Sequence, residues 1–396
     1  MKILVLTAEL PYPPNHGGGR LRQYELLSRI STQNKIHLLS FQESEQDLQY
    51  AKEAEDLFAS VSIVKRLPQK PHWILDRVRP HFRRHYDSTE LKVLLNEKRN
   101  QLKPDLVYVT PGYMAFYGKE LSGTPMWLDA TDSLTLGASA KAKSAKSSVK
   151  GLKFTYRKFQ LKQYEQDNYR TFEGISTVSE RDAEVLRSFL SPEKVNVIEN
   201  GVDLEAFSPD PNSVREPGKL IFTGRMDYSP NVDAVKWFCS EILPLIQKEI
   251  KEVHFEIVGR DPTPEVMELN QLSGVKVSGF VEDLASEVRK SSIFVCPIRL
   301  GSGMKNKILE AMALGMPIVS TSEGASGLHV KDGQELLLRD NPKSFAQAVI
   351  NLLKESSESE RMGAKAHNYI KSHHNWESWT NKLEDHFHNL VNHARQ

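Results

Sequence analysis

Residues 293–320 read IFVCPIRLGSGMKNKILEAMALGMPIVS and combine three local patterns. The apolar run Ile293–Pro297 is typical of a buried strand, and a Gly-Ser-Gly loop follows it at residues 301–303. A helix is expected from about Lys305, and Gly315 ends that helix before the next apolar run begins. This order of strand, loop, helix and strand predicts an α/β fold with a parallel sheet.

The same alternation extends in both directions along the chain. Strands are predicted in the first half at Ile3–Leu6, Ile36–Ser40, Val61–Val64, Leu106–Val109, Met126–Leu128, Gly174–Val178 and Val195–Ile198. Strands are predicted in the second half at Leu220–Thr223, His254–Val258, Val275–Val277, Ile293–Pro297, Ile318–Ser320 and Glu335–Leu338. We therefore expect two doubly wound domains, 1–207 and 219–372, with a linker at 208–218 and a terminal helix at 373–396.

Composition narrows the class of protein. The 396 residues include 39% hydrophobic residues and carry a net charge of +1, which excludes a disordered chain and gives no global field for binding nucleic acid. The two cysteines, Cys239 and Cys296, are too few for a disulfide framework. The first strand is too short for a signal peptide, and no apolar run approaches the ~18 residues of a membrane span. We expect a cytoplasmic protein.

The 301–303 loop predicts a phosphate site. Ligands of open parallel sheets bind beyond the carboxyl ends of the strands, where a glycine loop and a helix N-terminus favour anions. Lys305 and Lys307 add cations there, and Glu310 is placed to accept hydrogen bonds from two adjacent ribose hydroxyls. The alternative is an ordinary helix start with a solvated lysine pair and an i,i+3 pair between Lys307 and Glu310.

A second loop favours the nucleotide interpretation. The strand Leu220–Thr223 runs into Gly224 and Arg225, and the strand His254–Val258 runs into Gly259 and Arg260. Arginine binds phosphate oxygens in a bidentate manner. Two strand ends that combine glycine with a cation predict one diphosphate site at this edge of the second domain.

These motifs carry a resemblance to a known family. They are NGVD at 200–203, GR at 224–225, GFVED at 279–283 and GSGMKNKILEAMALGMPIVST at 301–321, supported by PPNHGGG at 13–19. Over nearly its full length the chain resembles the retaining glycosyltransferases of the GT-B fold, family 4 (glycosyl transferases group 1). The resemblance implies two Rossmann-like domains, a C-terminal helix that crosses back onto the first, and sugar transfer from a nucleotide-diphosphate sugar without a cofactor or metal ion.

The resemblance also implies the positions of the donor site. Arg225 is expected at the diphosphate, the backbone of Phe280 and Val281 at the base, and Glu310 at the ribose. Gly17 and Gly18 are expected beneath the phosphates from the first domain. The glycine-rich segments around the diphosphate comprise Gly224, Gly301, Ser302 and Gly303.

Two positions depart from the family pattern. A glutamate that usually contacts the donor sugar is replaced by Ser302, and the usual lysine after the arginine is replaced by Pro230 and Asn231. A branch of the family carries a basic residue in the glycine-rich loop instead. We hypothesise that Lys305 or Lys307 supplies the missing charge.

The expected catalytic residues are Arg225, Lys305, Lys307 and Asp132. The three cations would stabilise the leaving phosphate, which itself accepts the acceptor proton. Asp132 follows the strand Met126–Leu128 and is a candidate for contact with the sugar or the acceptor. The alternative is that Asp129 or Asp132 caps a helix.

The first domain carries a basic segment. Residues 141–162 contain eight lysines and arginines, no acid, and the aromatic residues Phe154, Tyr156 and Phe159. Such a segment can dock on anionic lipid at the inner face of a membrane, or it can form a solvated helix and loop. Reversed charge at Lys150, Lys153 and Arg157 would separate the two.

The sequence therefore predicts a retaining hexosyl- or N-acetylhexosaminyltransferase. Its partners would be a nucleotide-sugar donor and a saccharide or lipid-linked acceptor, in cell-surface polysaccharide or glycolipid assembly. The alternatives are a sugar-nucleotide epimerase or hydrolase of the same fold, and a non-catalytic protein that binds nucleotide sugars.

Overall fold

The computed structural model describes residues 1–14, 18–67, 79–121, 123–144, 149–301 and 303–395. The chain divides into two compact units. The first unit contains Met1–Glu199 together with Trp376–Gln396, and the second contains Asn200–Asn375.

The first unit is built on a parallel sheet. Its strands are β1 (Lys2–Thr7), β2 (Lys35–Gln42), β3 (Ser60–Lys65), β4 (Leu106–Thr110), β5 (Met126–Thr131), β6 (Gly174–Thr177) and β7 (Val195–Val197). Their order across the sheet is β3-β2-β1-β4-β5-β6-β7, and neighbouring strands are parallel. All carboxyl ends therefore lie at one edge of the sheet.

Helices cover both faces of this sheet. They are α1 (Gly18–Ile30), α2 (Asp47–Ala54), α4 (Arg83–Tyr86), α5 (Thr89–Leu102), α6 (Leu134–Ser144), α7 (Val149–Tyr169), α8 (Glu180–Arg187) and α16 (Trp376–Arg395), with shorter 3₁₀ turns η2 (Gly112–Glu120) and η3 (Pro192–Lys194). Along β1, Ile3 and Val5 join one buried cluster, whereas Leu4 and Leu6 join the other. The alternation of buried side chains explains why the strands read as continuous apolar runs.

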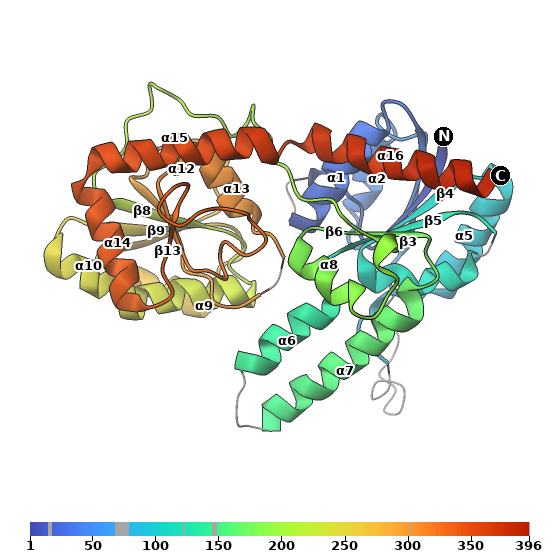
Figure 1. Cartoon of the computed structure of the whole chain (residues 1–396), viewed down its shortest axis with the longest axis horizontal. Helices are drawn as coiled ribbons and strands as arrows, with labels where there is room; N and C mark the ends of the chain where they lie inside the picture. Colours follow the sequence, from blue (N-terminus) through green and yellow to red (C-terminus); the bar gives the residue numbers. More distant parts are fainter. Residues whose placement is uncertain (15–17, 68–78, 122, 145–148, 302, 396) are drawn as a thin grey trace. The chain divides into compact units, whose positions relative to one another are not determined.

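The last helix of the chain completes the first unit. From α16, Trp376, Leu383, Phe387 and Val391 enter the same cluster as Ile3 and Val5 of the sheet. The Phe387 ring lies 5.7 Å from that of Tyr108 and 5.6 Å from that of Trp127. Figure 1 shows α16 in red beside α1 in blue, so the two ends of the chain fold together.

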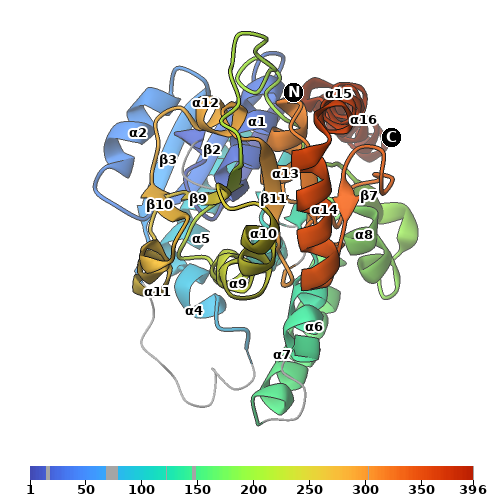
Figure 2. The same cartoon turned by 90° about the vertical axis from the view of Figure 1, so that its left-hand side faces the viewer.

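The second unit repeats the architecture with a six-stranded parallel sheet in the part of the chain that the structure describes. Its strands are β8 (Lys219–Thr223), β9 (His254–Val258), β10 (Val275–Gly279), β11 (Ile293–Cys296), β12 (Ile318–Ser320) and β13 (Leu337–Leu338), in the order β10-β9-β8-β11-β12-β13. Its helices are α9 (Ser229–Trp237), α10 (Leu243–Glu249), α11 (Pro264–Met267), α12 (Leu284–Arg289), α13 (Asn306–Ala313), α14 (Pro342–Lys354) and α15 (Ser356–His373), with the irregular turns η4 (Phe238–Ile242) and η5 (Glu268–Gln271). Figure 2 shows α14 beside α10.

Every strand predicted from the sequence is present, with ends that differ from the prediction by at most three residues. The expected linker at 208–218 differs from the structure, in which the division falls between Glu199 and Asn200. The reason is that the polar stretch packs on the second unit: Arg289 donates a hydrogen bond to the Ser208 carbonyl at 3.0 Å, and Arg215 donates to the Gly315 carbonyl at 3.0 Å. Among the residues placed by the structure, no helix has the length and apolarity needed to cross a membrane.

We expect truncation of Phe387 to destabilise the first unit. The side chain is 1% exposed and sits between the rings of Tyr108 and Trp127, so Phe387→Ala leaves a cavity that costs about 3–5 kcal/mol of unfolding free energy. Urea unfolding monitored by tryptophan fluorescence measures the change. Asn389→Ala, at an exposed position of the same helix, is the matched control. Equal stability of the two variants would contradict the packing of α16.

Candidate functional site in the second unit

Hydrogen bonds between neighbouring loops organise the carboxyl edge of the second sheet. The Gly224 amide donates to the Val258 carbonyl at 3.0 Å, and the Met226 amide donates to the Arg260 carbonyl at 2.9 Å. The Gly259 amide donates to the Gly279 carbonyl at 2.8 Å. The loops after β8, β9 and β10 are thereby fixed side by side.

Glycine is required where these loops touch. A Cβ atom on Gly259 would lie 1.7 Å from the Gly224 carbonyl oxygen, and one on Gly224 would lie 2.5 Å from the Lys307 ammonium. Both glycines have φ near +150°, a conformation that other residues rarely adopt. Close packing therefore requires a glycine before each of the two arginines.

Lys307 reaches from α13 into the space beside β8. Its ammonium donates a hydrogen bond to Asn231 Oδ1 at 2.8 Å and lies 3.9 Å from the centre of the Phe222 ring. Burial lowers the pKa of Lys307 to about 8. Lys307 therefore contacts Asn231, one of the two residues that replace the lysine expected after Arg225.

Arg225 lies on the other side of Asn231. Asn231 is 5% exposed and donates from Nδ2 to the Arg225 carbonyl at 2.7 Å. The Arg225 guanidinium is half exposed and donates from Nε to Asp227 at 3.1 Å, and this hydrogen bond lowers the pKa of the Asp227 carboxyl. Asn231 thus joins the Lys307 ammonium to the Arg225 backbone through one buried amide.

The glycine-rich loop brings a third cation. Lys305 precedes α13 and donates to the Gly303 carbonyl at 2.6 Å, and it makes no side-chain cap for the helix. The first amides of α13 are therefore available to an anion. Gly301 and Gly303 have φ of +133° and +71°, which suits a loop that approaches a ligand closely. Ser302 lies outside the described residues.

Glu310 and Phe280 are the remaining residues of the second unit that were predicted for the donor site. Burial raises the pKa of Glu310 to about 7, and the charge of Lys307 acts in the opposite direction. The i,i+3 ion pair that was the alternative interpretation is not among the pairs formed by the described residues, and Lys307 contacts Asn231 instead. The Phe280 side chain is 61% exposed beside the partly buried Val281, and the Arg260 guanidinium lies 5.3 Å from its ring centre.

Asp132 belongs to the first unit, where it follows β5. The preceding residue, Thr131, has φ of +63°, a costly conformation for a β-branched residue and one that clusters at functional sites. Asp129 is fully buried and forms a bidentate pair with Arg22 at 2.9 Å, so it does not cap a helix. Gly18 is the first residue of α1, and Gly17 lies outside the described residues.

The start of α6 is capped by the Ser133 hydroxyl, which accepts from the Leu136 amide at 3.3 Å, and by a second residue that the sequence analysis did not identify. Glu165, buried on α7, accepts hydrogen bonds from the backbone amides of Leu134 at 2.7 Å and Thr135 at 3.3 Å. Burial raises the pKa of the Glu165 carboxyl to about 7. This contact closes the base of the α6–α7 hairpin next to Asp132. The first acid after a long acid-free segment was the available signal in the sequence.

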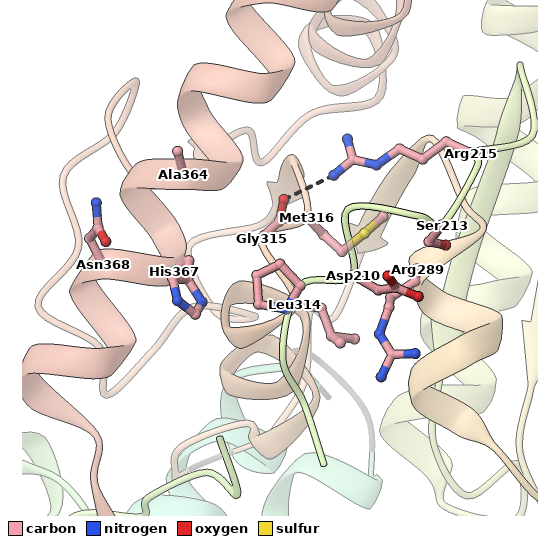
Figure 3. A pocket seen from close by; sticks show the side chains of 11 residues that line it. Asp210, Ser213, Arg215, Arg289, Leu314, Gly315, Met316, Ala364, His367 and Asn368 are labelled. Atoms are coloured by element: carbon pink, nitrogen blue, oxygen red, sulfur yellow. Dashed lines mark hydrogen bonds between the residues drawn. The ribbon is translucent and has the colours of Figure 1, made fainter. Parts of the chain in front are cut away.

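A separate cavity of about 320 Å³ lies at the opposite end of α13 (Figure 3). Its lining includes Leu314, Gly315, Arg215 and His367, and the dashed line in the figure marks the hydrogen bond from Arg215 to the Gly315 carbonyl. These residues lie beyond the C-terminus of α13, whereas Lys305 and Lys307 lie at its start. The cavity is therefore distinct from the cationic edge.

The cationic edge falls within a known sequence family. Residues 217–355 match the model described as glycosyl transferases group 1. This range contains Arg225, Lys305, Lys307, Glu310 and Phe280.

Two relatives are similar to this chain over different lengths. An uncharacterised 44.6 kDa protein in the cps region of Klebsiella pneumoniae is 23% identical over 394 residues, covering 94% of this chain and 96% of that protein. A UDP-Gal:α-D-GlcNAc-diphosphoundecaprenol α-1,3-galactosyltransferase of Escherichia coli is 26% identical over 181 residues, covering 41% of this chain and 46% of that enzyme.

Solved structures confirm the fold. Sucrose-phosphate synthase from Thermosynechococcus elongatus superposes with a TM-score of 0.73 at 15% identity, covering 98% of this chain and 99% of that one. Anabaena HepE in complex with UDP gives a TM-score of 0.68 at 14% identity, covering 98% and 100%. The expected GT-B fold, with two parallel-sheet units and a C-terminal helix that returns to the first, is therefore confirmed.

We expect the Lys307 ammonium to titrate near pH 8 in the unliganded protein, because its burial penalises the charged form. The side chain is then a cation below pH 8 and neutral above it. Nuclear magnetic resonance of ¹³C-labelled lysine side chains measures the titration. Lys307→Arg should remove the shifted resonance, and Lys305→Arg should leave it in place. A Lys307 titration above pH 10 would contradict the buried environment.

Proposed function

We propose that the protein is a retaining glycosyltransferase that transfers a hexosyl or N-acetylhexosaminyl group from a nucleotide-diphosphate sugar to a hydroxyl acceptor. The observation that carries the proposal is that Arg225, Lys305 and Lys307 all follow strands at the carboxyl edge of the second sheet, where Asn231 connects the Lys307 ammonium to the Arg225 backbone. The family match over residues 217–355 supports the same activity.

Three positive groups suit the chemistry of the donor. The bond between the anomeric carbon and the phosphate oxygen breaks, and negative charge accumulates on the departing nucleoside diphosphate. Preorganised cations and helix amides stabilise that charge. The acceptor oxygen bonds to the same face of the sugar, and its proton passes to the leaving phosphate. These side chains supply the positive charge, so the proposal needs no resident metal ion.

The nucleoside would extend from the diphosphate along the strand ends. Glu310, on α13, is a carboxylate that would accept hydrogen bonds from the two ribose hydroxyls. The exposed ring of Phe280, with the Arg260 guanidinium beside it, offers a surface for the base. The UDP complex of the structurally similar HepE makes uridine nucleotides the first donors to test.

The first unit would bind the acceptor, with Asp132 contacting the sugar or the acceptor hydroxyl. The strained backbone of Thr131 supports a functional position for its neighbour. The Escherichia coli relative acts on a diphosphoundecaprenol-linked sugar, which makes a lipid-linked saccharide of cell-surface polysaccharide or glycolipid assembly the acceptor class that we propose.

Loss of one site cation should slow turnover by about 10²–10³-fold and loss of two by at least as much, because each variant removes preorganised positive charge from the leaving group. The variants are Arg225→Ala and the double variant Lys305→Ala, Lys307→Ala. The assay incubates nucleotide sugars with saccharide and lipid-linked acceptors and measures acceptor-dependent release of nucleoside diphosphate. Nuclear magnetic resonance of the product gives the anomeric configuration.

Lys236→Ala is the matched control, because Lys236 is exposed on α9 and pairs with Glu265. Its turnover should equal that of the wild type. Interconversion of nucleotide sugars without acceptor would instead indicate an epimerase, and hydrolysis without acceptor a hydrolase. Tight binding with no turnover would indicate a non-catalytic binding protein. Full activity in the double lysine variant would refute the assignment of Lys305 and Lys307.

We also propose that the α6–α7 hairpin contacts anionic lipid. Figures 1 and 2 show α6 and α7 side by side, extending from the sheet of the first unit. On α7 the side chains of Tyr156 and Phe159 are 51% and 65% exposed, and Lys153 and Lys158 are exposed near them. Exposed aromatic rings among cations suit the interface of an anionic membrane.

Neutralising three exposed lysines of α7 should weaken vesicle binding by about a hundredfold, because each cation contributes about 1 kcal/mol near an anionic surface. The variant is Lys153→Gln, Lys158→Gln, Lys162→Gln, and co-sedimentation with phosphatidylglycerol vesicles measures it. The matched control neutralises the exposed Lys236, Lys248 and Lys343 of the second unit. If the two triple variants lost vesicle binding equally, the loss would be a nonspecific effect of charge, and the proposed contact of α7 with lipid would be refuted.

A further inference from the structure

We propose that Glu323 is a specificity-determining residue that accepts hydrogen bonds from hydroxyl groups of the donor sugar. The inference rests on the proposed function, because it assigns the sugar end of the same donor site. It concerns the turn after β12, which the sequence analysis did not connect with the glycine-rich loop.

Glu323 is linked to the glycine-rich loop through one serine. Ser326 Oγ lies 3.4 Å from Glu323 Oε1 and 3.4 Å from the Lys305 ammonium. The same hydroxyl lies 3.5 Å from the Gly303 carbonyl oxygen, which accepts a hydrogen bond from Lys305. A half-buried carboxylate therefore stands beside the loop in which Ser302 replaces the glutamate expected from the resemblance.

The turn that carries Glu323 is fixed on both sides. Thr321 Oγ1 donates to the Ile298 carbonyl and accepts from the Gly324 amide at 2.9 Å. Ser322 donates from its amide and its hydroxyl to Asp340, at 2.8 and 2.7 Å. The backbone that carries Glu323 is therefore held in place before a ligand arrives, which limits the positions that its carboxylate can reach and so favours selective recognition.

Close packing of Gly324 strengthens this constraint. A Cβ atom at this position would lie 2.5 Å from Ser320 Oγ and 2.9 Å from the Cys296 carbonyl oxygen. The backbone next to Glu323 therefore lies directly against the ends of β11 and β12. The ends of two strands therefore determine where the backbone of Glu323 lies, and no long surface loop is involved.

The order of the strands places Glu323 at the sugar end of the ligand. The exposed Phe280 ring and Arg260 follow β10 and β9, which lie at one side of the sheet. The cations Arg225 and Lys307 follow β8 and β11, which lie at its centre. A nucleotide sugar is linear, with the diphosphate between the nucleoside and the sugar. If the nucleoside takes the β10–β9 side, the sugar extends towards β12 and its turn.

The chemistry of a carboxylate fits hydroxyl groups at this place. Glu323 would repel the diphosphate, so its position near Lys305 is poorly explained by phosphate binding. An ionised carboxylate accepts several hydrogen bonds and can hold two neighbouring hydroxyls. A carboxylate that merely orients Lys305 through Ser326 would affect nucleoside diphosphate and nucleotide sugar equally.

The test compares the two ligand types in one variant. Dissociation constants of UDP, UDP-glucose, UDP-galactose and UDP-N-acetylglucosamine, and of GDP and GDP-mannose, are measured by calorimetry for the wild type and Glu323→Gln. We expect binding of the preferred nucleotide sugar to weaken about ten- to a hundredfold, because hydrogen bonds to a charged group are lost. Binding of the matching nucleoside diphosphate should change by less than about twofold.

Nucleoside diphosphate binding also reports that the variant is folded. Glu358→Gln, at an exposed position on α15, is the matched control and should leave both ligands unaffected. Equal weakening of both ligands, or no change in either, overturns the assignment of Glu323 alone. If the wild type binds none of the nucleoside diphosphates, the proposed function fails, and the assignment of Glu323 fails with it.

Discussion

The hydrogen bond between Lys307 and Asn231 is the interaction on which the organisation of the site depends. It joins the start of α13 to the start of α9, and the second half of the Asn231 amide holds the Arg225 backbone. Desolvation makes the buried ammonium costly, and the Phe222 ring and the amide oxygen offset part of that cost. An anionic ligand would supply the remaining compensation, which is a physical reason for the unliganded site to attract a diphosphate.

Neighbouring strands supply the groups that single positions in the sequence lack. Asn231 stands where a lysine was expected after Arg225, yet the Lys307 ammonium from α13 contacts its amide. The glycine-rich loop holds Ser302, yet Glu323 from the turn after β12 stands beside that loop through Ser326. The ends of parallel strands meet at one edge of the sheet. A charged side chain that one loop lacks can therefore come from a neighbouring loop.

At the carboxyl edge of the first sheet, buried charged side chains bond to other groups of the protein. Arg22 and Asp129 form a buried bidentate pair beneath it, and Glu165 closes the start of α6. These charges are satisfied internally, so they fix the backbone around Thr131 and Asp132 rather than meet a ligand. The hairpin that begins there carries the exposed aromatic and basic side chains of α7. Its proposed membrane contact is thus built directly onto the proposed acceptor edge.

The sequence by itself determined the order of the strands along the chain and the cationic character of the carboxyl edge of the second sheet. Apolar runs buried on both faces, and glycine beside arginine or lysine at strand ends, are local signals. The sequence did not determine that residues 200–218 pack with the second unit, or that Asn231 connects the Lys307 ammonium to the Arg225 backbone. It also did not reveal the proximity of Glu323 to Gly303. Those facts depend on contacts between loops far apart in the chain, and only the pairing of parallel strands brings such loops together.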